Sequence, residues 1–331
     1  MTPLANRVAN LMDWLTGIIP DIPTPFDETG AVDLGAFARL CERQMRAGVS
    51  AIVVGETSGE FNTLSWDERE TIIRAATEVA GGQARVIAGA GSNSTGQAAA
   101  WARRAEAAGA DALLSVVPYY NKPMQAGIEA HFRTIADATA LPIILHDDPS
   151  RTIRGLSDDT LATLSQSPQF IGVKDSTGDL SRPARLRSRV PALFRLLSGN
   201  DPTALAFLCS GGDGCISILS NVAPSACRDM LSSYEQGRMP AARQWQQRLS
   251  RLAECLAAEN PAAVKYVLSL LGLMRPDTRL PLVGLSDQAK AKVADAILEI
   301  GENDLTRDER NVSRAISARD LAYSSAPGDI S

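Results

Sequence analysis

The chain is poor in the residues from which metal centres and nucleic-acid surfaces are built. It has two histidines among 331 residues, 5% aromatic residues, and a formal net charge of −5 without a basic cluster. Histidine-based metal sites and polyanion-binding surfaces both need side chains that are scarce here. We therefore expect no metal ion and no nucleic-acid partner. No apolar run approaches the roughly 18 residues that span a bilayer, so we also expect no membrane segment.

Motifs for disulfides, zinc and nucleotides are also missing. The five cysteines show no CxxC spacing, which is typical of scattered thiols in a reducing compartment. No GxGxxG follows the first β-like run, and the sequence has no GxxxxGK[ST] phosphate loop. Residues 1–14 lack the apolar stretch and cleavage site of a signal peptide. We expect a cytoplasmic protein that binds no nucleotide.

What the chain does have is a regular alternation of short apolar runs and amphipathic stretches. Eight such runs alternating with helical patterns favour a (β/α)8 barrel over a doubly wound sheet. Ser65 and Glu68 form a capping box that should begin one of the helices. The predicted strands are Ile18–Ile22, Ser50–Val54, Arg85–Gly89, Ala112–Val117, Pro142–His146, Gln169–Lys174, Phe194–Leu197 and Gly214–Ile218.

The strand pattern stops after about residue 223, and helical periodicity continues. Apolar residues repeat at helical spacing from Trp245 to Leu256, and Ser286 is placed to cap a last helix. The sequence thus predicts an α/β TIM barrel over 17–230 and a C-terminal helical extension over 231–300. Residues 1–16 form an N-terminal extension, and the polar stretch 301–331 is predicted to be a flexible tail.

Lys174 is the strongest candidate for chemistry. It ends the apolar run 170–173 and precedes a turn signature, Asp-Ser-Thr-Gly. Strand alternation puts Lys174, Gly172 and Phe170 on one face, with Ile171 on the other. An amine on the inner face of a buried strand should have its pKa lowered by desolvation, which favours a nucleophile that forms a Schiff base with a carbonyl group. The alternative is a strand-end lysine that reaches solvent.

Two further strand ends carry groups that could hold or protonate a substrate. The run 55–60, Gly-Glu-Thr-Ser-Gly-Glu, can direct backbone amides and hydroxyls at a carboxylate, although an ordinary glycine-rich turn also explains it. His146 lies on the same strand face as Ile144, so it should point into the barrel as Lys174 does. A single inward histidine can equally be a hydrogen-bonded structural group.

Three loop residues are weaker candidates. Tyr120 could relay protons or simply pack at its loop. Arg151 could bind a substrate carboxylate with two hydrogen bonds, or pair with Asp147 or Asp148 at the surface. Gly199 could allow close approach of a ligand, although a helix cap just after it would explain the local composition equally well.

Four ordered motifs make the chain resemble one family. They are the run 55–60, Pro-Tyr-Tyr-Asn-Lys-Pro at 118–123, Pro-Ser-Arg-Thr at 149–152 and Gly-Val-Lys-Asp-Ser-Thr-Gly-Asp at 172–179. Together they resemble the dihydrodipicolinate synthase / N-acetylneuraminate lyase family of Schiff-base barrel enzymes, from about residue 17 to residue 300. The resemblance implies a pyruvate-dependent lyase without a cofactor, in which Lys174 forms an imine with the keto group.

The resemblance also implies roles around Lys174. Thr57 and Ser58 would hold the pyruvate carboxylate and pass protons, while Gly199 and Ile216 would line the pyruvate pocket. Tyr120 would enter the site of a neighbouring subunit, which implies a homodimer or homotetramer.

A last residue implied by the resemblance concerns the second substrate. Arg151 would bind the carboxylate of the aldehyde. The family pattern departs at His146, where a tyrosine is usual, and at the two following aspartates. Since histidine can donate and accept protons near neutral pH, we hypothesise a Thr57–His146–Tyr120 relay.

Three functions remain open from the sequence. The first is 4-hydroxy-tetrahydrodipicolinate synthase chemistry on pyruvate and L-aspartate 4-semialdehyde. The second is an aldolase or dehydratase of 2-keto-3-deoxy sugar acids, in which His146 and the two aspartates would contact substrate hydroxyls. The third is a pyruvate-binding homologue without catalytic activity.

Overall fold

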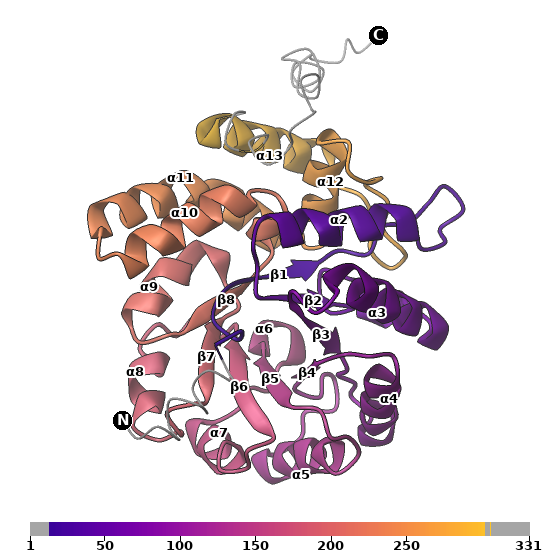
Figure 1. Ribbon diagram of the computed structural model, residues 1–331, viewed down its shortest axis with the longest axis vertical. Coiled ribbons are helices and arrows are strands. Elements are labelled where there is room, and N and C mark those ends of the chain that lie inside the picture. The colour runs from indigo at the N-terminus through magenta and orange to yellow at the C-terminus, as the bar shows by residue number, and fades with distance from the viewer. Residues whose placement is uncertain (1–12, 302–304, 306–331) are drawn as a thin grey trace.

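The computed structural model describes residues 13–301 and residue 305, and its centre is a closed barrel of eight parallel strands in sequence order. All eight predicted strands are present, each within one or two residues of its expected ends (Figure 1). The (β/α)8 prediction is therefore confirmed. The strands are β1 Gly17–Ile22, β2 Ala51–Val54, β3 Arg85–Gly89, β4 Ala112–Val116, β5 Ile143–Asp147, β6 Phe170–Asp175, β7 Arg195–Ser198 and β8 Gly214–Ser217.

Helices follow the strands and surround them (Figure 1). The helix after β2 begins as predicted, because Ser65 Oγ accepts from Glu68 N at 3.2 Å and Glu68 Oε2 accepts from Ser65 N at 2.8 Å. The helices of the barrel are α2 Leu34–Arg46, α3 Trp66–Ala80, α4 Thr95–Ala107, α5 Gln125–Ala136, α6 Pro149–Thr152, α7 Asp158–Leu164, α8 Arg182–Arg187, α9 Ala204–Cys209 and α10 Pro224–Glu235.

Two apolar layers hold the barrel together. One fills its interior with side chains such as Ile19, Val53 and Ile144, and the other lies between the strands and the helices. Active groups of this architecture gather where strands meet the loops that follow them, so the interior layer forms the floor of any site at that end.

The strand that carries Lys174 contains an irregularity that the sequence did not reveal. Ile143 pairs with Phe170 but Ile144 pairs with Gly172, so β6 has one extra residue opposite β5. As a result Ile171 packs inside the barrel and Phe170 packs outside it. The predicted shared face of Phe170 and Lys174 is therefore wrong. Beyond the bulge the register is regular, and Lys174 pairs with His146.

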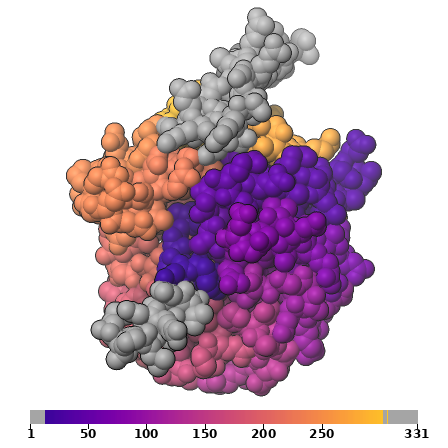
Figure 2. Space-filling model, viewed as in Figure 1, coloured from indigo at the N-terminus to yellow at the C-terminus, as the bar shows by residue number. Residues whose placement is uncertain are grey.

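The C-terminal extension is helical, as predicted. It consists of α11 Met239–Ala258, α12 Ala262–Leu270 and α13 Asp287–Ile300, and Ser286 caps α13 by accepting from Ala289 N at 3.2 Å. These helices, orange to yellow, cover one edge of the molecule beside the indigo N-terminal elements (Figure 2).

The predicted domain limits can be compared with these elements. The boundary after residue 230 lies inside α10, which is the helix that follows β8. Most of the predicted extension 1–16 and tail 301–331 lies outside the described residues. Between residues 13 and 301, no helix is long and apolar enough to cross a bilayer.

Candidate active site

Lys174 lies inside the barrel near the end of β6, as the sequence predicts. Its side chain is 6% exposed, and its Nζ lies 3.6 Å from Glu56 Oε2 and 3.7 Å from Asp21 Oδ2. Both distances are longer than a good hydrogen bond. The amine is therefore held between two buried carboxylates without being locked to either.

These carboxylates reverse the expected protonation of the lysine. Burial alone lowers the pKa of an amine, but the charges of Glu56 and Asp21 outweigh it and raise the pKa of Lys174 above its usual 10.5. The expectation that the pKa of Lys174 is lowered is thus wrong. Lys174 is an ammonium ion at rest, and a neighbouring base must take its proton before it can attack a carbonyl carbon.

The pKa values of the two carboxylates shift in opposite directions. Desolvation raises the pKa of Asp21 to about 6, and the Lys174 charge only partly opposes the rise. For Glu56, burial acts in the same direction, but His146 and Lys174 beside it bring the pKa well below its usual 4.5. Near neutral pH, Glu56 is ionised.

Glu56 joins the predicted residues to one another. Its Oε2 accepts from both the backbone N and the Oγ1 of Thr57, each at 2.5 Å, and its Oε1 lies 2.9 Å from His146 Nδ1. Glu56 and His146 are each 2% exposed. The structure therefore brings Lys174, Thr57 and His146 together, with the Glu56 carboxylate between them.

Ser58 connects the site to the C-terminal extension. Its backbone N donates to Asp21 Oδ2 at 3.4 Å, and its Oγ donates to Asn260 Oδ1 at 3.3 Å. Asn260 comes from the loop between α11 and α12. The carboxylate-binding pair expected at Thr57 and Ser58 thus has partners within the chain when no ligand is bound.

Three of these residues were not selected from the sequence. Glu56 stands within the motif 55–60, but its glycines and hydroxyls drew the interpretation. Asp21 had a usable signal, because an acidic residue inside an apolar strand and two positions after the inward Ile19 should point into the barrel. Asn260 had none, since only the fold brings residue 260 to the site.

Gly199 directly follows β7, and Ile216 lies on β8. Ile216 is buried in the interior layer. A Cβ on Gly199 would lie 2.0 Å from Ser176 Oγ, and Gly199 N donates to Asp175 O at 2.7 Å. A side chain at residue 199 would crowd Ser176 in the loop that follows β6, and the contact with a ligand stays a prediction.

Arg151 and Tyr120 do not reach Lys174 within this chain. Arg151 is half exposed, and its Nε lies 3.5 Å from Asp148 Oδ2, which is the surface pairing considered above. Tyr120 is 85% exposed and has a φ of +69°, a left-handed conformation that few non-glycine residues adopt. Within one chain Tyr120 does not join Thr57 and His146, so the Thr57–His146–Tyr120 relay stays a prediction that depends on a second subunit.

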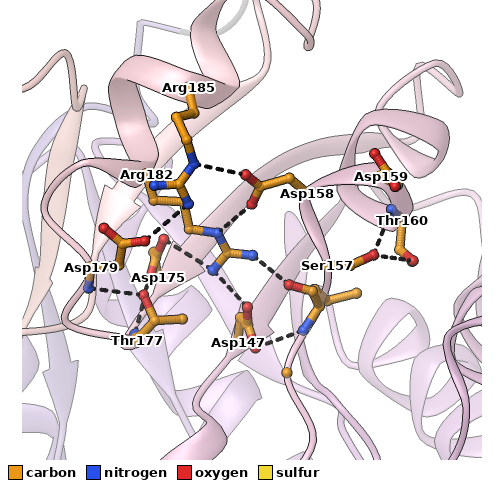
Figure 3. Close-up of polar contacts among 12 residues, drawn as sticks. Asp147, Ser157, Asp158, Asp159, Thr160, Asp175, Thr177, Asp179, Arg182 and Arg185 are labelled. Carbon is orange, nitrogen blue, oxygen red and sulfur yellow. Dashed lines mark hydrogen bonds and ion pairs between the residues drawn. The ribbon is translucent and has the colours of Figure 1, made fainter.

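Asp147, the first of the two aspartates after His146, belongs to a buried ion-pair network outside the barrel interior. Asp147 points away from the barrel interior and contacts Arg182, which also binds Asp175 and Asp158 (Figure 3). This buried network fixes the ends of β5 and β6, and the second oxygen of Asp147 accepts from Leu156 N at 3.0 Å.

Comparison with known proteins decides the family. The model of the dihydrodipicolinate synthetase family matches residues 14–300. The chain belongs to this family. It is 45% identical over 290 residues to the 4-hydroxy-tetrahydrodipicolinate synthase of Hyphomonas neptunium, an alignment covering 87% of this chain and 99% of that protein. The predicted family and enzyme class, a lyase of the aldolase type, are confirmed.

Solved structures of family members show the same fold. The 4-hydroxy-tetrahydrodipicolinate synthase of Methylacidiphilum fumariolicum superposes with a TM-score of 0.85 at 35% identity, covering 89% of this chain and 98% of that one. The dihydrodipicolinate synthase of Acinetobacter baumannii, solved with pyruvate, has a TM-score of 0.83 at 36% identity, covering 86% and 99%. Another similar structure, with a TM-score of 0.84, is described as a monomeric variant.

Proposed function

We propose that the protein is a Schiff-base lyase that condenses pyruvate with L-aspartate 4-semialdehyde and acts as a 4-hydroxy-tetrahydrodipicolinate synthase, the name that its relatives carry. The observation that carries this proposal is the buried Lys174 amine, whose side chain is 6% exposed and lies inside the barrel near the end of β6. The lysine itself supplies the electrophile once the imine forms, so the reaction needs no metal and no organic cofactor. We place the enzyme in the cytoplasm.

The proposed mechanism uses the residues in sequence. Lys174 attacks the keto carbon of pyruvate, and loss of water gives a protonated imine that withdraws electrons from the methyl carbon. Thr57 and Ser58 turn their amides and hydroxyls to the pyruvate carboxylate, exchanging their internal partners for it. Removal of a methyl proton gives an enamine, which attacks the aldehyde, and His146 moves protons in these steps.

Two surface residues complete the proposal. Arg151 binds the carboxylate of the aldehyde, for which its half-exposed guanidinium only has to leave Asp148. Tyr120 reaches into the site of a neighbouring subunit, so the active form is a homodimer or homotetramer. A tyrosine side chain that is 85% exposed at a loop end suits such a contact.

One observation favours a second candidate. The site contains a buried His146–Glu56 pair at 2.9 Å, which could protonate a departing hydroxyl group. A dehydratase of 2-keto-3-deoxy sugar acids requires such a proton donor, and the corresponding aldolase requires a base that takes a proton from a substrate hydroxyl. Asp147 already accepts from Arg182 and from Leu156 N, so a substrate hydroxyl would have to share its oxygens with these donors.

Reductive trapping tests the proposal. Incubation with pyruvate and sodium borohydride should add covalent mass at Lys174, and the Lys174→Ala variant is the matched control. Absence of added mass in the wild-type protein would refute a Schiff-base function and favour a non-catalytic homologue. Product analysis with aspartate semialdehyde and with 2-keto-3-deoxy sugar acids then separates the two enzyme candidates.

A further inference from the structure

Two buried carboxylates, Glu56 and Asp21, lie beside Lys174, and the mechanism described above gives neither of them a step. We propose that Glu56 is a catalytic residue that removes the proton from Lys174 and delivers it to the oxygen that leaves as water. This inference rests on the Schiff-base function and deepens it. It goes beyond the hydroxyl and histidine roles described above, because it assigns the proton transfers of imine formation to a carboxylate.

The position of Glu56 is suited to this task. Its Oε2 is 3.6 Å from Lys174 Nζ, so a small rotation brings it into hydrogen-bond distance of the amine. Its Oε1 is bound to His146 Nδ1 at 2.9 Å, which orients the carboxylate. Glu56 thus contacts the nucleophile through one oxygen and the group that orients it, His146, through the other.

The environment of Glu56 also argues for a working acid–base group. An ionised carboxylate that is 2% exposed is costly to bury unless its partners compensate for the lost water. Among residues 13–301, His146 Nε2 and Asp21 Oδ1 are buried around this group without a hydrogen-bond partner. Buried polar atoms in native proteins are nearly always paired, so these two atoms point to a polar ligand that completes the site.

Binding of a keto acid would release Glu56 for its role. In the ligand-free site Glu56 Oε2 accepts both Thr57 donors, at 2.5 Å each. A substrate carboxylate that takes these donors leaves Oε2 with Lys174 as its nearest partner. Transfer of the Thr57 donors to the substrate carboxylate therefore makes Glu56 Oε2 available as the base for Lys174.

The proton balance of imine formation closes with this one carboxylate. Glu56 takes a proton from the Lys174 ammonium, and the neutral amine adds to the keto carbon to give an N-protonated alkoxide. Transfer of a second proton from nitrogen to that oxygen gives the carbinolamine. Glu56 then returns its proton to the hydroxyl, the C–O bond breaks, and water leaves as the nitrogen lone pair forms the protonated imine. The carboxylate is regenerated.

Asp21 is the other carboxylate near the amine and supplies the matched comparison. It lies at almost the same distance from Lys174, 3.7 Å, but its hydrogen bond comes from Ser58 N and it has no bond to His146 that would orient it. Burial raises its pKa to about 6, so near neutral pH it too is mostly ionised. If the charge near Lys174 were all that mattered, neutralising either residue would have the same effect.

The test measures the pre-steady-state rate of imine formation with pyruvate. Samples are quenched with borohydride, and the trapped adduct is quantified by mass spectrometry of the intact protein. Glu56→Gln should slow imine formation by about 10²–10⁴-fold, the usual loss of a general acid–base group. Asp21→Asn should slow it less than tenfold. Glu56→Asp should recover part of the rate and keep the pH dependence that Glu56→Gln loses. Glu42→Gln, on the exposed face of α2, is the surface control.

The outcomes separate this inference from the proposed function. Trapping in the wild-type protein with equal rates for the wild type and Glu56→Gln would overturn the role of Glu56 and leave the Schiff-base function intact. Equal losses in Glu56→Gln and Asp21→Asn would also overturn it, in favour of a charge effect alone. If Glu56→Gln fails to fold, Glu56→Asp must still show a slower imine step with an unchanged pH profile, and an undiminished rate in Glu56→Asp would contradict the proposal.

Discussion

Lys174 on β6 and Lys265 on α12 are both buried beside a glutamate of the same loop, Glu56 and Glu60 respectively. Lys265 is fully buried, forms a close ion pair with Glu60, donates to Asp277 O at 2.9 Å and lies 4.0 Å from the ring centre of Phe26. Lys174 has carboxylates at 3.6 and 3.7 Å, beyond good hydrogen-bond distance. The Lys265 amine thus has a close ion pair and a hydrogen bond, whereas the Lys174 amine has no partner within hydrogen-bond distance among these carboxylates.

Burial alone therefore does not identify the nucleophile. The pKa of Lys265 is lowered by burial to about 8, whereas the pKa of Lys174 is raised because two carboxylates outweigh its burial. A search for the buried lysine with the lower pKa would select Lys265. What distinguishes Lys174 is the absence of a close ion pair and its position near the end of a barrel strand, where the active groups of this architecture gather.

The largest expected effect comes from Lys174→Met. Turnover should fall on the order of 10⁵-fold or more, as it does when other enzymes lose a covalent nucleophile. The free energy of unfolding should fall less than in the matching Lys265 variant. Glu56 keeps its hydrogen bonds with Thr57 and His146, and Asp21 can become neutral by taking up a proton. Steady-state assays and urea unfolding measure the two effects, and residual turnover above about one thousandth would contradict the assignment of the nucleophile.

The converse variant, Lys265→Met, should damage stability and spare the chemistry. Removing one partner of a buried ion pair typically costs about 3–5 kcal/mol, since the other charge is left without compensation. The double variant Glu60→Gln/Lys265→Met should recover part of that loss. Borohydride trapping at Lys174 should persist in both proteins wherever they remain folded. Unchanged urea midpoints would show that the Lys265 pair adds nothing to the fold.

The barrel could be predicted from sequence because its signals are local. Each strand is a short apolar run, and caps such as Ser65 and Ser286 mark helix starts within a few residues. The bulge at Ile171 could not be predicted this way. It depends on how β6 meets β5, and an apolar run carries no record of its pairing partner.

The site was only partly predictable for a related reason. Lys174, Thr57 and His146 lie at strand ends, and strand alternation brings them to the same end of the barrel. The protonation of Lys174 depends on Asp21 and Glu56, which are far from it in sequence, and Asn260 reaches the site only through the C-terminal extension. Charges that meet in space set a pKa, and composition along the chain does not show which ones meet.

The third prediction concerns how the stability of the protein depends on pH, because Asp21 beside Lys174 titrates at an unusual pH. Asp21 has its pKa raised from 3.8 to about 6 by burial, so the folded protein favours its protonated form. The resulting stabilisation is fully present below pH 3.8 and is lost as the pH rises through about 6. Asp21→Asn should therefore gain stability relative to the wild type across this window, by at most about 3 kcal/mol.

Urea unfolding of the wild type and Asp21→Asn between pH 4 and pH 7 measures the difference. Asp277→Asn, an exposed position near the other lysine, is the control and should follow the wild type throughout. A gap between wild type and Asp21→Asn that does not change with pH would mean that Asp21 keeps an ordinary pKa in the folded protein.

The smallest effect concerns the ring beside Lys265. Phe26 is buried, and the guanidinium of Arg279 lies 4.3 Å from its ring centre, so two cations contact the same ring. Phe26→Leu keeps an apolar side chain but removes the ring, and should cost about 1–2 kcal/mol in urea unfolding. A double-mutant cycle with Lys265→Met isolates the part that belongs to the amine. Coupling above about 0.5 kcal/mol shows that the ring stabilises the ammonium, whereas additive losses mean that Phe26 only fills space and that the ion pair with Glu60 alone accounts for the buried charge.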